Sequence, residues 1–369
     1  MAKEEKKAPK LRFNGYTNDW ERKELNNILK INSGRDYKQL NSGNIPVYGT
    51  GGYMLSVNDK LSDTDAVGIG RKGTIDKPLY LKAPFWTVDT LFYCTSKENS
   101  DVKFIYLLFQ IINWKRYDES TGVPSLSKNT ISSIKTYVPK VKEQDHISKL
   151  FFSLDNTLQL HERKCEELAL IKKALLQKLF PKKDEIKPEV RYKNFSDAWE
   201  QRKLGEVVER FDNLRIPVTS SKREKGITPY YGANGIQDYV QGYTHDGEFV
   251  LVAEDGANDL QNYPVHYVNG KVWVNNHAHV LQGKNKMVDN LFLVNAIKQI
   301  KIETYLVGGS RAKLNADVMM KLPIKVPTFN EQQKIGEYFS KFDTLITLHQ
   351  RKLEKLKQLK KFLLQNMFI

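Results

Sequence analysis

Apolar residues recur every three or four positions in two long stretches of this chain, which predicts long helices at 139–180 and 327–369. The spacing alternates between four and three, so each helix carries a narrow apolar stripe that must be buried against another helix. A helix of about 36 residues extends ~54 Å at 1.5 Å per residue. The stripe on each helix is the nearest available partner for the stripe on the other, so we expect the two helices to form a coiled coil. We expect them to run antiparallel because a globular part separates them in the sequence. The predicted seam consists of Ile147, Phe151, Leu154, Leu158, His161, Leu168 and Leu175 in the first helix, and of Ile335, Phe339, Phe342, Ile346, His349, Leu353, Leu356 and Leu363 in the second.

The chain is an internal repeat. "LQLHERK" (158–164) and "ITLHQRK" (346–352) correspond without a gap, 188 positions apart. Segments that precede the helices also correspond: "PKLRFNGYTNDWERKEL" resembles "PEVRYKNFSDAWEQRKL", and "IPVYGTGGY" resembles "TPYYGANGI". Each copy is therefore a divergent globular part followed by a near-constant helix, which predicts a pseudo-two-fold molecule.

The divergent parts alternate short β-branched and aromatic runs with glycine-rich turns and a few helices, which favours a mixed α/β (α+β) fold for both. The predicted domains are a flexible basic N-terminus (1–10), a first globular domain (11–138), the first helix (139–180), a linker (181–189), a second globular domain (190–326) and the second helix (327–369). The charged, proline-bounded "PKKDEIKPEV" marks the joint between the copies.

Two interpretations of the seam histidines stay open. His161 and His349 occupy equivalent positions near the middle of their helices, so an antiparallel pair would bring them close together. They would then be a register device or a pH-sensitive point. The simpler interpretation is that each is hydrogen-bonded locally within the seam.

The charge balance points to a polyanionic partner. Lys and Arg number 58 against 43 Asp and Glu, a formal net charge of +15 over 369 residues, which favours nucleic acid or an acidic membrane surface. A basic protein without such a partner is the alternative. The longest apolar run, "FIYLLFQII", is far shorter than the ~20 residues of a membrane helix, and "MAKEEKKAPK" lacks a signal-peptide core, so we expect a cytoplasmic protein.

Motifs for common catalytic sites are missing from the sequence. "VGIGRKGT" (67–74) has the spacing G-x-G-x-x-G, but the residues after it are strand and turn material rather than the helix that a dinucleotide site needs. We find no phosphate loop, nucleophile elbow or H-E-x-x-H, and no Asn/Asp-Pro-Pro-aromatic motif of an adenine methyltransferase. His277 and His279 are two apart on one predicted strand, yet lack a third metal ligand, so structural hydrogen bonding explains them better than a metal site. We therefore expect no catalytic residues and no metal site.

Polar side chains on the glycine-rich turns and neighbouring loops are candidates for DNA contact. Arg and Lys bind guanine edges or phosphates, and Asn binds adenine. For any single residue, a solvated loop side chain is an equally good explanation. The predicted DNA-binding residues are Tyr48, Thr50, Arg71, Lys72, Thr121, Ser125, Ser127 and Lys128 in the first part, and Tyr231, Asn234, Asn275, Asn276, Ser310, Arg311 and Lys313 in the second.

Together these features resemble the specificity subunit of Type I restriction-modification enzymes. The resemblance covers nearly the whole chain and depends most on the paired "P…EQ…I…LH…RK…LL" helices and on "AEDGAN" and "VNNHAHVL" in the second part. It implies two target-recognition domains that each read one half of a split, asymmetric DNA site, separated by a helical spacer. "WTVDTLFY" stands in the first part where the second has "WVNNHAHV", so residue roles do not transfer between the halves.

The resemblance also implies partners that carry the chemistry. Two modification subunits would bind S-adenosylmethionine and methylate adenine, and restriction subunits would use ATP and Mg. No cofactor is expected in this chain itself. Two other hypotheses remain: a DNA methyltransferase acting alone, which should bind S-adenosylmethionine by itself, and a coiled-coil scaffold without a nucleic-acid function, which should protect no DNA.

Overall fold

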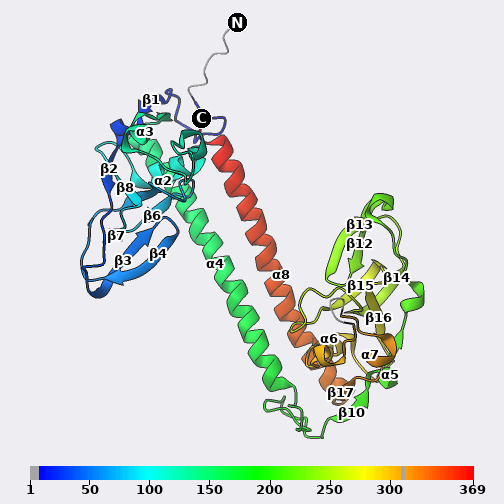
Figure 1. Ribbon diagram of the computed structural model, residues 1–369. Coiled ribbons are helices and arrows are strands. Elements are labelled where there is room, and N and C mark those ends of the chain that lie inside the picture. Colours follow the sequence, from blue (N-terminus) through cyan, green and yellow to red (C-terminus); the bar gives the residue numbers. More distant parts are fainter. Residues whose placement is uncertain (1–7, 309–311) are drawn as a thin grey trace. The chain divides into compact units, whose positions relative to one another are not determined.

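The chain forms two compact units in a computed structural model that describes residues 8–308 and 312–369 (Figure 1). Unit 1 spans Met1–His161 and Arg351–Ile369, and unit 2 spans Glu162–Gln350. These limits differ from the predicted domains, because each long helix contributes one half to each unit.

Unit 1 contains three small sheets, with strand orders β2-β8-β5-β6, β4-β3-β7 and β1-β9. Its strands are β1 (Glu21–Glu24), β2 (Leu29–Ser33), β3 (Ser42–Gly49), β4 (Gly52–Val57), β5 (Ala66–Gly70), β6 (Leu79–Leu81), β7 (Trp86–Thr87), β8 (Leu91–Ser96) and β9 (Lys135–Val138). Its shorter helices are α1 (Leu25–Ile28), α2 (Val102–Ile111), the 3-10 turn η1 (Trp114–Tyr117) and α3 (Lys128–Ser133). β5 has all five residues buried and is followed by a loop and β6, so the G-x-G-x-x-G segment has the strand but not the helix of a dinucleotide site.

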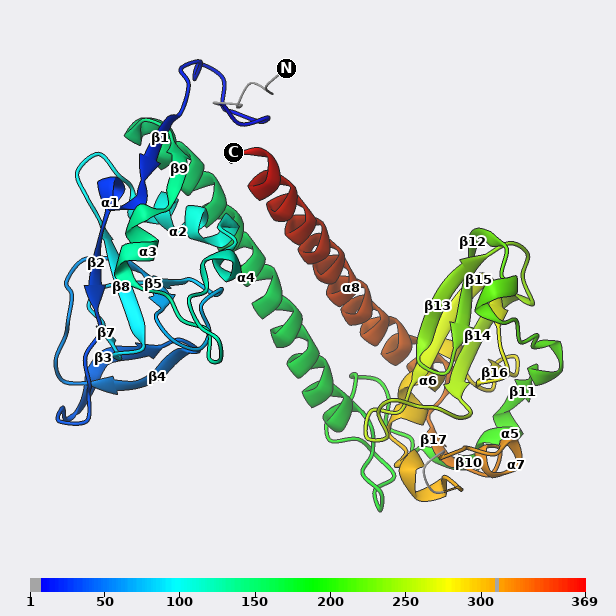
Figure 2. The ribbon, with the colours of Figure 1, turned by 45° about the horizontal axis from the view of Figure 1, so that its top comes forward.

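Unit 2 repeats this plan with a larger sheet of order β11-β16-β14-β15-β12-β13 and a second pair, β10-β17 (Figure 2). Its strands are β10 (Glu200–Lys203), β11 (Val208–Arg210), β12 (Lys225–Gly232), β13 (Gly235–Val240), β14 (His245–Ala253), β15 (Val265–Val274), β16 (Ala278–Gly283) and β17 (Pro323–Val326). Its shorter helices are α5 (Leu204–Val207), η2 (Asp212–Leu214), η3 (Ser220–Lys222), α6 (Asn290–Lys298), η4 (Ile302–Tyr305) and α7 (Ala316–Met319). The β12–β15 and β3–β7 pairs are parallel and the other pairs antiparallel, so both units are mixed α/β as predicted.

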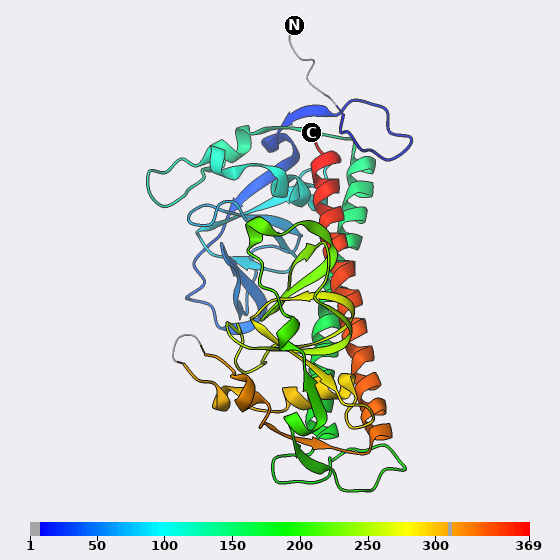
Figure 3. The same cartoon turned by 90° about the vertical axis from the view of Figure 1, so that its right-hand side faces the viewer.

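The two long helices are α4 (Val141–Leu179) and α8 (Phe329–Asn366), which lie within the predicted segments 139–180 and 327–369. Within unit 1 the ammonium of Lys360, late in α8, lies 2.6 Å from the carboxylate of Asp155, which is in the earlier half of α4. Within unit 2 Lys172 contacts Asp343 at the same distance. Each ion pair joins an earlier residue of one long helix to a later residue of the other, which is the order expected for antiparallel helices (Figure 3).

Seam burial is deepest near the globular parts and weaker toward the middle of the helices. Seven predicted seam residues are buried, namely Ile147, Phe151, Leu154, Leu158, Ile335, Phe339 and Leu363. The other eight are half-buried, namely His161, Leu168, Leu175, Phe342, Ile346, His349, Leu353 and Leu356. All fifteen predicted seam residues are thus at least half-buried, and those that pack deepest belong to the cores of the two units.

Each globular core includes the end of one long helix and the start of the other. Phe368, at the end of the chain, stacks on Phe104 of α2 in unit 1 with ring centroids 5.5 Å apart. In unit 2 Phe180 stacks on Phe292 of α6 at 5.4 Å. The two pairs are equivalent in the repeat, so the duplicated sequence builds the same aromatic core twice.

The repeated Glu-Gln dipeptide fixes each long helix to its unit. Gln144 accepts a hydrogen bond from the N–H of Asp101, the N-cap of α2, and donates to the Pro139 carbonyl. Gln332 contacts Asp289, the N-cap of α6, and Pro327 in the same way. Among the described residues no helix is long and apolar enough to cross a membrane.

Candidate nucleic-acid interface

In each unit four loop segments meet where several strands end. In unit 1 we call them the first loop cluster, which consists of residues 49–52, 71–73, 88–90 and 124–126. In unit 2 the second loop cluster consists of residues 232–235, 254–258, 275–277 and 313–314. Most of the predicted DNA-binding residues lie on these segments.

Backbone hydrogen bonds hold the first loop cluster together. The N–H of Arg71 donates to the Thr90 carbonyl at 2.8 Å, and the Arg71 carbonyl accepts from the N–H of Leu126 at 2.9 Å. Lys72 and Ser125 also form an isolated β-bridge. Gly73 follows with φ of +92°, a conformation that favours glycine and turns the chain out of the bridge.

The second loop cluster has the same frame. The N–H of Glu254 donates to the His277 carbonyl at 2.8 Å, and the Glu254 carbonyl accepts from Leu314 at 2.7 Å. Asp255 and Lys313 form the equivalent bridge. Gly256, like Gly73, has a positive φ, so the sequence alignment of "VGIGRKGT" with "VLVAEDGA" agrees with the structure.

The first loop cluster is cationic. Arg71 and Lys128 both lie over the ring of the buried Phe92, at 5.9 and 5.8 Å from its centroid. Lys72 is exposed beside them, and the Thr50 hydroxyl lies near Gly73. No ion pair joins these three cations to a carboxylate in the part of the chain that the structure describes. The structure thus brings Arg71 and Lys128 together over Phe92, with Lys72 next to Arg71 on the same loop, so three positive charges are available to an anion.

The remaining predictions in unit 1 have structural roles or lie at the edge of the cluster. The Ser127 hydroxyl caps α3, accepting from the N–H of Thr130 and donating to Glu119. The N–H of Ser125 donates to Asp118, and this bond is the main reason that the pKa of Asp118 lies below its ordinary value. Thr121 is exposed in the loop that Asp118 closes, and Tyr48 is half-buried on β3 with its ring 6.4 Å from that of Tyr53. Ser127 is therefore occupied as a helix cap.

In unit 2, two predicted asparagines hold turns in place. The Asn234 side chain donates to the Gly256 carbonyl and accepts from the N–H of Asn258, both at 2.9 Å. Asn275 is buried, and its side chain accepts from the N–H of His277 at 2.8 Å. Both side-chain amides therefore stabilise the loop backbone through these hydrogen bonds.

The other predicted residues of unit 2 differ in exposure. Asn276 is exposed next to this turn. Tyr231 is half-buried on β12, where burial raises the pKa of its phenol, and its carbonyl accepts from the N–H of Asn275. The predicted residues Ser310 and Arg311 lie outside the described residues.

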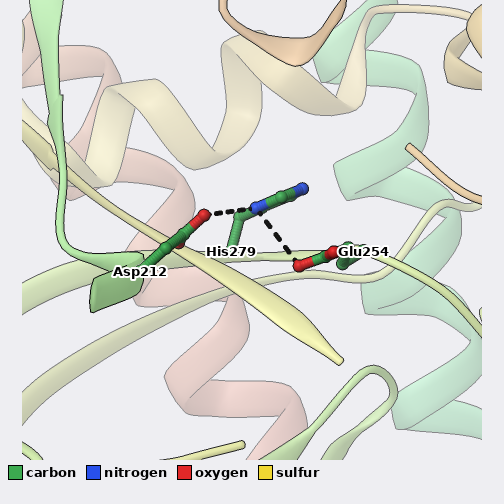
Figure 4. A group of neighbouring side chains, drawn as sticks. All are labelled: Asp212, Glu254 and His279. Carbon is green, nitrogen blue, oxygen red and sulfur yellow. Dashed lines mark hydrogen bonds and ion pairs between the residues drawn. The ribbon is translucent and has the colours of Figure 1, made fainter. Parts of the chain in front are cut away.

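Three buried or half-buried ionisable side chains converge beneath the second loop cluster (Figure 4). Nδ1 of His279 lies 2.7 Å from Asp212 Oδ2 and 3.6 Å from Glu254 Oε2. Nε2 of His279 lies 2.8 Å from the Leu314 carbonyl oxygen. Burial alone would raise the pKa of Asp212, but its hydrogen bond to His279 and the charge of that ring lower it below the ordinary value.

Cations balance the two carboxylates of this network. Arg215 donates to Glu254 Oε2 at 2.6 Å and lies 3.5 Å from Asp212 Oδ2. Lys313, a predicted DNA-binding residue, contacts Glu254 Oε1 at 2.8 Å. Burial raises the pKa of Glu254, but the bonds from Lys313 and Arg215 outweigh it, so the pKa is lowered. Lys313 therefore forms an ion pair with Glu254, whereas Lys72 in unit 1 pairs with no carboxylate among the described residues.

The ligand atoms of Asp212, Glu254 and His279 lie within 4.8 Å of one another, as metal ligands would. These atoms, however, already have partners in the protein: the ring nitrogens of His279 lie against Asp212 Oδ2 and the Leu314 carbonyl, Asp212 Oδ1 accepts from the N–H of Val280, and Glu254 is paired with Arg215 and Lys313. The arrangement is that of an ion-pair network. His277 lies in the turn before β16 rather than on the strand, and its ring contacts Asp255 at 2.5 Å.

The sequence drew attention to His279 but not to Phe92, the residue that takes its place in unit 1. Phe92 and His279 are equivalent, since Phe92 pairs with Ile69 across β5–β8 and His279 pairs with Val252 across β14–β16. A signal was available in the alignment, because Arg71-Lys72 of one copy stands opposite Glu254-Asp255 of the other. A reversal of charge at a matched loop position indicates two surfaces of different chemistry on one scaffold.

A family model described as "Type I restriction modification DNA specificity domain" matches the chain twice, at residues 17–170 and 196–358. The solved S subunit of a Type-I restriction-modification system from M. genitalium superposes with a TM-score of 0.80 over 98% of this chain and 99% of that one, at 16% identity, which indicates a shared fold.

Two sequence relatives carry related names. A Haemophilus influenzae protein named as a type I restriction enzyme specificity subunit is 47% identical over 136 residues, 37% of this chain and 35% of that protein. The MjaVIII specificity subunit of Methanocaldococcus jannaschii is 24% identical over 281 residues, 67% of this chain and 64% of that protein. The chain thus spans between about a third and just under two thirds of the length of these relatives.

Proposed function

Because this chain belongs to the Type I restriction modification DNA specificity domain family, we propose that it is the DNA-reading subunit of a Type I restriction-modification complex. Each unit reads one half of a bipartite, asymmetric site through its loop cluster. The chain itself performs no chemistry. Modification subunits that bind S-adenosylmethionine methylate adenine at the sites that it selects, and restriction subunits use ATP and Mg.

The observation that carries this proposal is the equivalence of Arg71 and Glu254. The same backbone frame presents Arg71 and Lys72 in unit 1 and Glu254 and Asp255 in unit 2. A duplicated scaffold with opposite charges at matched loop positions suits two dissimilar DNA sequences, since base edges are distinguished by donor and acceptor patterns. The net charge of +15 supplies the general attraction to DNA.

The test is the methylation pattern in cells that carry this protein with its modification subunits. Single-molecule sequencing should show methylated adenines in a split site with unlike halves. Replacement of residues 11–138 by the corresponding part of another specificity subunit should change one half-site only. A pattern in which both halves change together would contradict the assignment of one half-site to each unit.

We also propose that α4 and α8 set the number of unread base pairs between the half-sites. Both helices contribute to both units, so a change in their length should alter spacing without touching either loop cluster. Insertion of four residues, about one helical turn, in both helices should change the permitted spacer and leave both half-sites as they were. Altered half-sites with an unchanged spacer would refute this role.

A further inference from the structure

The side chain at one matched position differs in kind between the two units. Phe92 on β8 supports Arg71 from below in unit 1, whereas His279 on β16 occupies the equivalent place in unit 2. His279 is 1% exposed, so it cannot contact DNA itself. Its position makes it a candidate for shaping the loops above it.

Hydrogen bonds connect His279 to three segments of the second loop cluster. Its Nε2 contacts the Leu314 carbonyl, and the N–H of Leu314 donates to the Glu254 carbonyl. The N–H of Glu254 in turn donates to the His277 carbonyl. This chain of bonds passes from residue 314 through residue 254 to the turn at 275–277, so the ring and the loop backbones form one connected unit.

The geometry fixes the direction of one hydrogen bond of the ring. A backbone carbonyl can only accept a hydrogen bond, so Nε2 of His279 donates to the Leu314 carbonyl at 2.8 Å. Nδ1 lies 2.7 Å from Asp212 Oδ2 on the other side of the ring.

The charges around His279 come from every segment packed on it. Asp212 of η2 and Glu254 at the end of β14 carry negative charge. Arg215 lies 3.5 Å from Asp212, Arg210 of β11 lies 3.7 Å from the same oxygen, and Lys313 lies on Glu254. Removal of the ring alone therefore leaves Asp212 Oδ2 without its contact to Nδ1 of His279.

Resting on the proposed function, we propose that His279 is the positioning residue of the second loop cluster: its Nε2–H, through the Leu314 carbonyl, holds the Leu314 and Glu254 backbones in the conformation that reads the second half-site. Unit 1 achieves the same support without a titratable group, through Phe92. Recognition of the two half-sites therefore depends on different chemistry beneath equivalent loops.

The experiment compares two double variants in the complex with the modification subunits. D212N/H279F removes the ring together with the carboxylate that contacts its Nδ1, but leaves the Leu314 carbonyl without a donor. D212N/H279Q is matched to it, except that the glutamine amide can donate to that carbonyl. Affinity is measured for the cognate DNA and for two DNAs in which one base pair is changed in either half-site.

We expect D212N/H279F to lose about tenfold in discrimination at the second half-site, the scale of one misread base pair, with discrimination at the first half-site unchanged. D212N/H279Q should retain most of the discrimination at the second half-site. The two variants should have similar melting temperatures. The proposal is overturned if the two variants discriminate equally well at the second half-site, or if D212N/H279F loses both half-sites alike. If the unaltered complex binds no DNA with preference, it is the proposed function that fails.

Discussion

The guanidinium of Arg12 donates to both carboxylate oxygens of Glu143, at 2.6 and 2.8 Å. The pair ties the segment that enters unit 1 to the first turn of α4, with Glu143 1% exposed. Arg191 and Glu331 form the same bidentate pair in unit 2, at 2.8 and 2.7 Å. Both pairs come from matched positions of the repeat, so each copy attaches its leading segment to its own long helix.

Arg12→Ala should therefore destabilise unit 1 strongly. It leaves a buried Glu143 carboxylate without its cation, and loss of one partner of a buried pair costs about 3–5 kcal/mol in free energy of unfolding. Urea unfolding followed by tryptophan fluorescence measures this, since the indole N–H of Trp20 lies 3.4 Å from Glu143. The control is Lys23→Gln, which breaks an exposed ion pair with Glu21 and should change little. Equal midpoints for the two variants would show that the Arg12 pair is not stabilising.

The antiparallel pairing of α4 and α8 can be tested by exchange of charges. Lys360→Asp places like charges together against Asp155 and should lower the melting temperature, by an amount that corresponds to about 1 kcal/mol or less for a partly exposed pair. The double variant Lys360→Asp with Asp155→Lys restores an opposite-charge pair and should recover most of the loss. Recovery of the melting temperature would show that these two residues are in contact. The same exchange at Lys172 and Asp343 repeats the test independently in unit 2.

Much of the fold could be predicted from the sequence because the chain contains two copies of one pattern, and residues that match between the copies can be compared. The long helices, the joint between copies and the matched loops all follow from aligned residues such as Gly73 and Gly256. The supporting residues could not be predicted, because Asp212 and His279 lie 67 positions apart and meet only through the sheet. Ser127 is predicted as a DNA-binding residue because a serine suits both a helix cap and a DNA ligand, and local geometry makes it a cap.

Acid should weaken unit 2 through its ion-pair network. The pKa values of Asp212 and Glu254 are lowered from ordinary values of 3.8 and 4.5, because hydrogen bonds and charges from His279, Lys313 and Arg215 outweigh burial. Carboxylates with a lowered folded pKa stabilise the protein above their unfolded pKa, and this stability is lost as pH falls through the folded value. The free energy of unfolding should therefore decrease below about pH 4.

Asp212→Asn provides the comparison for this acid dependence. Asparagine keeps an oxygen that can accept from the N–H of Val280, as Asp212 Oδ1 does at 2.8 Å, but cannot be protonated in this range. Urea unfolding at a series of pH values should show a shallower loss of stability in acid for the variant. Parallel curves for the variant and the unaltered protein would mean that Asp212 contributes nothing to acid sensitivity.

The cationic surface of the first loop cluster predicts a change in salt dependence. Arg71→Gln together with Lys72→Gln removes two exposed positive charges that pair with no carboxylate in the described residues. Removal of one phosphate-binding charge reduces the slope of log affinity against log salt by about 1, whereas removal of a base-reading side chain costs about 1–3 kcal/mol and relaxes one position of the site.

DNA binding by the complex at several salt concentrations, with first-half and second-half variants of the site, separates these two effects of the Arg71 and Lys72 substitutions. Lys23→Gln, in the separate β1–β9 pair, is a control that also removes positive charge, and it should leave half-site preference unchanged. If the double variant loses preference at the second half-site instead of the first, then unit 1 does not read the half-site assigned to it, since Glu254 and Asp255 at the matched place are untouched.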